Sequence, residues 1–173
     1  FFFVACDHLH RPEGPQMDVA EHEGHLHVRL QHSLRALKTP LRLLALSDTH
    51  DFHDDMPHPL PQADILVHAG DFTCRGATDE IRHFMEWTDR LLETGTVADV
   101  VVVAGNHECT LELKARNPKV LQNQRELKRA LADRPHVHYL QDEARCIGGI
   151  RFYGTPWTTR CGRDWAFQLL DDD

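Results

Sequence analysis

The sequence contains no apolar run long enough to cross a membrane. Its longest uninterrupted apolar stretches are residues 1–6 and 100–104, whereas a membrane-spanning helix needs about 20 apolar residues. A basic segment followed by an apolar core and a cleavage site of small residues, the signature of a secretory leader, is also missing. We therefore expect no membrane helix, no signal peptide and no membrane partner.

The cysteines form no C-x-x-C pair. There are five of them, an odd number, and they are widely spaced: Cys6, Cys74, Cys109, Cys146 and Cys161. A disulfide framework has an even number of cysteines, and zinc clusters use closely spaced pairs. The pattern fits a reducing compartment, and we expect a cytoplasmic location.

An excess of positive charge is absent as well. Lys and Arg number 19 against 27 Asp and Glu, which gives a formal net charge of -8. A broad nucleic-acid-binding surface needs clustered basic residues, so we expect no nucleic-acid partner. Phosphate binding must then come from a local site, and nothing in the composition sets the oligomeric state.

The chain divides into two parts at about residue 40. Residues 1–40 are rich in His, Glu, Pro and Gly and show no sustained periodicity, which predicts an irregular extension with a short helix near residues 30–37. A G-H-x-H string at residues 24–27 is interpreted as a coincidence of this composition, the alternative being a circularly permuted site. Residues 41–173 form the organised part.

Apolar runs and helical periodicity alternate in the organised part. Buried strands are predicted at residues 41–46, 64–68 and 100–103, the last as a central strand covered on both faces. Amphipathic helices are predicted at 78–95 and 119–133, followed by short strands at 136–140, 145–147 and 150–153, the last two joined by a Gly-Gly hairpin. This alternation predicts a layered α/β fold with largely parallel strands.

The first three predicted strands each end in residues that bind metals. Asp48 and His50 follow the first strand, Asp71 the second, and Asn106 and His107 the third. Ligand sites in parallel sheets form outside the carboxyl ends of the strands, so we expect these loops to converge. Asp48 and His50 flank one residue, and in an extended segment both side chains would leave on the same face and chelate one ion.

The donor types predict a hydrolytic metal centre. Carboxylate, amide and imidazole ligands without thiolate suit Mn, Fe, Zn or Mg. Asp71 can bridge two ions, as carboxylates do in two-metal hydrolases, and Asn106 would add a neutral oxygen to the second ion.

The order of the three blocks, D-x-H, G-D and G-N-H-E, resembles the calcineurin-like metallophosphoesterase superfamily. The blocks are residues 48–50, 70–71 and 105–108. A closer likeness, carried by residues 63–72, 139–142 and 153–157, is to the metallophosphoesterase-domain-containing subgroup related to class III cyclic-nucleotide phosphodiesterases. The resemblance implies the layered metallophosphoesterase sandwich and a phosphodiesterase acting on a small phosphate ester or nucleotide.

The resemblance also implies a role for each site residue. Asp48, His50 and Asp71 would hold the first of two divalent ions, and Asp71 and Asn106 the second, with Mn favoured. A metal-bound hydroxide would attack the phosphorus. His107 would not be a ligand, but would contact the phosphate and protonate the leaving oxygen.

Two further family blocks, a lone His and a G-H-x-H turn, do not follow Trp157. We therefore expect the chain to be the N-terminal part of the domain, with a fold incomplete at the C-terminus. The alternative is a non-catalytic or truncated member of the same fold that binds metal or nucleotide.

Several residues near the blocks keep two interpretations. His68, Thr49 and Glu108 could orient metal ligands through hydrogen bonds, or could be satisfied by backbone groups with no role in the site. Among the aromatic residues, Trp157 is the candidate for stacking on a substrate base.

Overall fold

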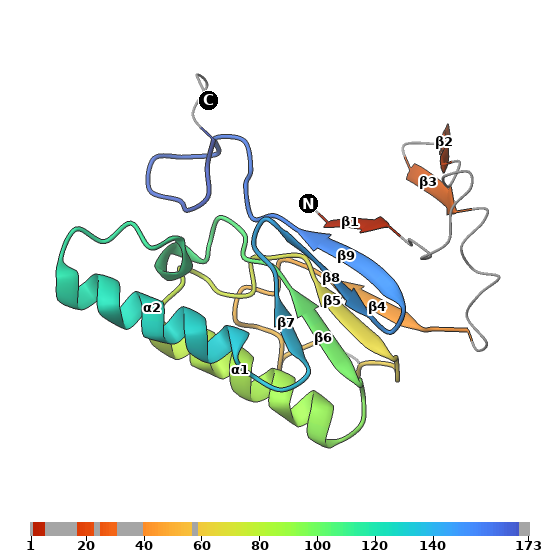
Figure 1. Ribbon diagram of the computed structural model, residues 1–173, viewed down its shortest axis with the longest axis horizontal. Helices are drawn as coiled ribbons and strands as arrows, with labels where there is room; N and C mark the ends of the chain where they lie inside the picture. The colour runs from red at the N-terminus through yellow and green to blue at the C-terminus, as the bar shows by residue number, and fades with distance from the viewer. Residues whose placement is uncertain (1, 6–16, 23–24, 31–39, 57–58, 170–173) are drawn as a thin grey trace.

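A four-stranded parallel sheet forms the centre of the molecule (Figure 1). The computed structural model describes residues 2–5, 17–22, 25–30, 40–56 and 59–169. The strands lie in the order β4-β5-β6-β7 and comprise Leu43–Leu46, Ile65–His68, Asp99–Val102 and Val137–Tyr139. The parallel arrangement predicted from the sequence is confirmed.

The two inner strands, β5 and β6, are buried on both faces. Val100 and Val102 belong to one core cluster, whereas Val101 and Val103 belong to a second cluster on the other face. This alternation follows from the strand period of two. Since both faces are covered, an uninterrupted run of valines is stable there, as the sequence predicts for a central strand.

Helices cover the first face of this sheet. They are α1 (Thr78–Glu93), α2 (Pro118–Ala132) and the short 3₁₀ helix η1 (Cys109–Glu112). At the start of α1 the Glu80 carboxylate accepts the backbone N–H of Ala77 at 2.8 Å. At the start of α2 the Asn117 side chain accepts the backbone N–H of Lys119 at 2.9 Å. Both predicted helices are confirmed.

An antiparallel sheet covers the second face (Figure 1). Its strand order is β1-β9-β8, and the strands comprise Phe2–Ala5, Ile150–Gly154 and Glu143–Ile147. Ile147, Ile150 and Phe152 pack against the inner strands of the parallel sheet. Gly148 and Gly149, both with positive φ, form the predicted hairpin. The result is a layered α/β sandwich, as predicted.

The prediction of a buried first strand is wrong. Among the described strands, β4 lies at the edge of the parallel sheet and pairs with β5 alone, and its residues are alternately exposed and half-buried. Leu43 keeps 43% of its surface exposed. The apolar run at 41–46 predicts a strand, but an apolar run does not distinguish an edge strand from a central strand.

The N-terminal segment contains strands that the sequence analysis did not predict. β2 (Met17–His22) and β3 (His25–Leu30) pair as an antiparallel hairpin. The helix expected near residues 30–37 falls almost wholly outside the described residues, and residue 30 itself ends β3. The division of the chain at residue 40 stays a prediction.

Neither α1 nor α2 is long and apolar enough to cross a membrane, and no other described helix is. The four cysteines within the described part of the chain are free thiols: Cys74, Cys109, Cys146 and Cys161.

Candidate metal centre

The loops after β4 and β5 are joined by backbone hydrogen bonds. The N–H groups of Asp48 and His50 donate to the carbonyl oxygens of Gly70 and Asp71, each at 3.0 Å. The N–H of Asp51 donates to the Phe72 carbonyl at 2.9 Å. The two loops therefore hold each other in place at the carboxyl ends of their strands.

The backbone of these loops is left-handed at several non-glycine residues. The φ angles are 55° at Asp48, 43° at His50 and 54° at Asp71. Each such residue costs about 1–3 kcal/mol, and such strain gathers at functional sites. The expectation that Asp48 and His50 sit in an extended segment is therefore wrong, and their chelation of one ion stays a prediction.

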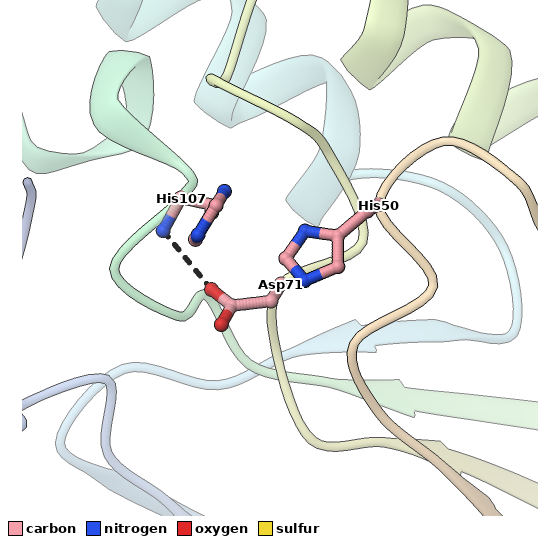
Figure 2. A group of neighbouring side chains, drawn as sticks. All are labelled: His50, Asp71 and His107. Carbon is pink, nitrogen blue, oxygen red and sulfur yellow. Dashed lines mark hydrogen bonds between the residues drawn. The ribbon is translucent and has the colours of Figure 1, made fainter.

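His50, Asp71 and His107 converge (Figure 2). One potential ligand atom from each lies within 4.8 Å of the others. The two imidazole rings are edge-to-face with centroids 4.4 Å apart. The backbone N–H of His107 donates to Asp71 Oδ1 at 3.0 Å, which leaves Oδ2 available.

The orientation of both imidazoles is fixed by backbone carbonyl groups. His50 Nδ1 lies 3.2 Å from the Thr73 oxygen, and His107 Nδ1 lies 2.6 Å from the Cys74 oxygen. Because a carbonyl oxygen only accepts hydrogen bonds, each Nδ1 carries a proton, and each Nε2 is the ring atom left for the site. Metal-binding histidines commonly donate their other ring N–H in this way.

Glu108 connects the loops that carry Asp71 and His107. Its side chain is fully buried and accepts the backbone N–H groups of Asp71 (2.9 Å), Thr73 (2.9 Å) and Gly105 (2.6 Å). The Thr73 hydroxyl donates to it as well, at 2.8 Å. Burial raises the pKa of Glu108 to about 7, and the hydrogen bonds from Gly105 and Thr73 act in the opposite direction. Glu108 thus orients the loop of Asp71, a role that the sequence left open.

Two glycines allow the loops after β5 and β6 to touch. A Cβ on Gly105 would lie 2.3 Å from Asp71 Oδ1, and a Cβ on Gly70 would lie 2.8 Å from the Gly105 nitrogen. Gly70 also has a φ of +103°, which side chains rarely adopt. The glycines of the G-D and G-N-H-E blocks are therefore required by packing.

Trp165 completes the surroundings of His107, and the sequence analysis did not select it. Its ring stacks on the imidazole at a centroid distance of 4.0 Å. The Ala166 N–H donates to the Asn106 carbonyl at 2.9 Å and holds this segment against the loop. Only this tertiary contact brings Trp165 to the site. Trp157, the predicted stacking candidate, instead donates its indole N–H to Asp142 at 2.9 Å.

The remaining predicted residues lie beside the cluster of His50, Asp71 and His107. Asp48 is exposed and, among the described residues, is not part of that cluster. Asn106 is half-buried. His68 is buried, its Nε2 lies 3.0 Å from Thr49 Oγ1, and burial lowers its pKa to about 3.

The donor set fits a divalent metal ion. One carboxylate and two imidazoles, with one potential ligand atom from each within 4.8 Å of the others, are ligands that Zn, Fe and Mn accept. The chain thus builds a metal-binding geometry from three separate strand ends.

Comparison with known proteins agrees with this geometry. Residues 41–161 match the family model described as calcineurin-like phosphoesterase. Metallophosphoesterase domain-containing protein 1 of Homo sapiens is 32% identical over 139 residues, covering 74% of this chain and 40% of that protein, and the Mus musculus protein gives the same values. A UPF0046 protein of Caenorhabditis elegans is 33% identical over 150 residues, covering 75% of this chain and 35% of its own length.

The chain therefore spans about 40% or less of the length of these relatives. The family match covers well over half of the chain and includes all three strand-end blocks. The chain belongs to the calcineurin-like phosphoesterase family, a group of metal-dependent phosphoester hydrolases.

Proposed function

We propose that the protein is a metal-dependent phosphodiesterase that works at a dinuclear centre. The observation that carries this proposal is the convergence of His50, Asp71 and His107, with both imidazole Nδ1 atoms bonded to backbone carbonyls. The substrate class is a small phosphate ester or nucleotide, consistent with a net charge of -8 that disfavours a long polyanion.

The proposed ligands are those expected from the sequence. Asp48, His50 and Asp71 would hold the first ion, and Asp71 and Asn106 the second, with Mn as the favoured metal. Asp48 is included among the ligands because the hydrogen bond from its backbone N–H to the Gly70 carbonyl keeps it beside the Asp71 loop. When bound, such ions polarise the phosphate and make a water molecule nucleophilic near neutral pH.

His107 is proposed as the group that protonates the leaving oxygen. Its Nδ1 is bonded to the Cys74 carbonyl, so Nε2 is the atom that can hold and deliver this proton. Stacking on Trp165 keeps the ring in one orientation. A positioned acid of this kind accelerates a reaction by about 100- to 10,000-fold.

Hydrolysis of bis(p-nitrophenyl) phosphate with added Mn²⁺ tests the proposal. Asp71→Asn should abolish turnover, whereas Asp79→Asn, which changes an acidic residue in the first turn of α1, should leave it unchanged. Absence of turnover with Mn, Fe, Zn and Mg alike, or full activity in Asp71→Asn, would contradict it.

The His107→Gln variant separates a proton donor from a metal ligand. A donor role predicts that kcat falls by about 100-fold or more while the affinity for Mn²⁺ is retained. A fall in Mn²⁺ affinity that accounts for the lost rate would instead make His107 a ligand.

A second candidate function is metal or nucleotide binding without turnover. The observation that favours it is that the described cluster offers one carboxylate and two imidazoles, with Asp48 exposed outside it. Calorimetry separates the two candidates, because nucleotide binding without hydrolysis supports the second and metal-dependent hydrolysis excludes it.

A further inference from the structure

A second group of metal-binding side chains lies between the loop after β4 and helix α1. Asp51 and His53 belong to the loop, and His83 belongs to α1. One potential ligand atom from each lies within 4.8 Å of the others. This group shares no residue with the cluster of His50, Asp71 and His107.

His53 is a buried histidine whose ring nitrogens have no hydrogen-bond partner. Only 1% of its surface is exposed, and both Nδ1 and Nε2 are buried without a partner. Leaving buried polar atoms unpaired is costly, and native structures rarely tolerate it without a bound water or ion. Burial also lowers the pKa of His53, which keeps the imidazole in the neutral form that binds metals.

His83 is held beside His53 by two carboxylates. Its Nδ1 lies 2.8 Å from Asp51 Oδ1, and its Nε2 lies 3.0 Å from Asp54 Oδ2. Arg90 donates to both oxygens of Asp54, at 2.7 and 2.5 Å, and neutralises that carboxylate. A metal ion bound by His83 Nδ1 and Asp51 would displace the proton that these two groups share, while the Nε2–H of His83 continues to donate to Asp54.

A cavity of about 280 Å³ borders one member of the group, His53. Its other lining residues are Asp54, Met56, Pro59, Leu60, Trp87, Leu91 and Thr96. A metal site needs an entry path in addition to its ligands, and this cavity is the nearest opening beside His53.

We propose that Asp51, His53 and His83 bind a divalent transition metal, and that Zn²⁺ is the ion this donor set fits best. Two imidazoles and a carboxylate are an established zinc-binding combination. The ion would supply the partner that His53 lacks and would fasten the loop that carries His50 to α1. This site lies outside the phosphodiesterase centre proposed above, and its role is structural.

The competing explanation is that His53 is only a packing residue. The centroid of its ring lies 5.8 Å from the ring centroid of Phe84 and 5.0 Å from that of Trp87. These distances are ordinary for packed aromatic side chains. If packing is its whole role, His53→Phe keeps an aromatic ring in this position and leaves zinc binding unchanged. If the site exists, His53→Phe and His83→Gln each remove a ligand.

Zinc content measured after equilibrium dialysis decides between these explanations. The comparison is made in the Asp71→Asn chain, where the other cluster is disabled. We expect about one Zn²⁺ per chain in this background, with affinity reduced at least about tenfold by either His53→Phe or His83→Gln. His136→Gln, which removes an exposed imidazole before β7, is the matched control and should retain the ion.

Melting temperatures provide a second readout. Zn²⁺ should raise the melting temperature of Asp71→Asn and of its His136→Gln derivative, but not that of the ligand variants, because only binding to the folded state stabilises it. Equal zinc binding in the ligand variants, or no zinc binding in Asp71→Asn, would overturn the proposal. If Asp71→Asn does not fold, His50→Gln, which removes another proposed ligand of the first centre, serves as the background. Phosphodiesterase activity is assayed separately, so the two proposals can fail independently.

Discussion

At the residue scale, Glu108 is the side chain on which the candidate metal centre depends most. It binds no metal in our proposal, yet it accepts three backbone N–H groups from the two loops that carry Asp71 and His107. A carboxylate is suited to this position because both of its oxygens only accept hydrogen bonds.

Glu108→Gln should therefore damage both stability and metal binding. The amide NH₂ would face backbone N–H donors, and at least one of them would lose its acceptor, at a cost of about 2–4 kcal/mol in the free energy of unfolding. Urea denaturation measures this loss. Glu126→Gln, which changes an exposed residue on α2, is the control and should have little effect.

A substitution at Gly105 tests whether metal binding requires the close approach of the loops after β5 and β6. In Gly105→Ala the new Cβ would collide with the Asp71 carboxylate, so we expect the affinity for Mn²⁺ to fall by about 10- to 100-fold. Calorimetric titration with Mn²⁺ measures the change. Gly95→Ala adds a Cβ in open space at a position of positive φ, and it should cost stability without changing Mn²⁺ affinity. Equal Mn²⁺ affinity in both variants would show that the contact between the loops is not needed.

At the scale of elements, β5 carries a histidine into the core. All four residues of β5 are buried, and His68 at its end is neutral because burial lowers its pKa from 6.5 to about 3. The unfolded chain binds a proton at His68 between these values and the folded chain does not. The free energy of unfolding therefore has its full value, as far as His68 is concerned, above pH 6.5, and it decreases as the pH falls from 6.5 towards 3.

His68→Gln should remove this pH dependence. The stability of the natural chain relative to the variant is expected to fall by about 1.4 kcal/mol for each pH unit below 6.5. Glu108, whose raised pKa acts in the opposite direction, is present in both chains and cancels in the difference. Urea denaturation at pH 7 and pH 5 checks the prediction, and an unchanged difference would contradict it.

At the scale of the whole molecule, the sequence predicts the layers and the position of the candidate site. The valine run of β6 and the periodicity of α1 depend on local pattern, and convergence at the carboxyl ends follows from the parallel sheet. Left-handed backbone at Asp48 and His50 could not be predicted, because it depends on hydrogen bonds to the loop after β5.

Other features depend on contacts between distant segments. Trp165 reaches His107 only because residues 165–167 dock on the loop after β6. His53 and His83 meet only because α1 packs beside the loop after β4. β4 lies at the sheet edge because, in the described part of the chain, β5 is its single pairing partner. None of these contacts has a local sequence signal.

The central claim is that His50 and Asp71 hold a divalent metal ion beside His107. The most direct test is calorimetric titration of Mn²⁺ into the His83→Gln chain, in which the second proposed site is disabled, with and without Asp71→Asn. We predict saturable Mn²⁺ binding that weakens at least about tenfold when Asp71 is replaced. Equal Mn²⁺ affinity in the two chains, or no binding in either, would contradict the account.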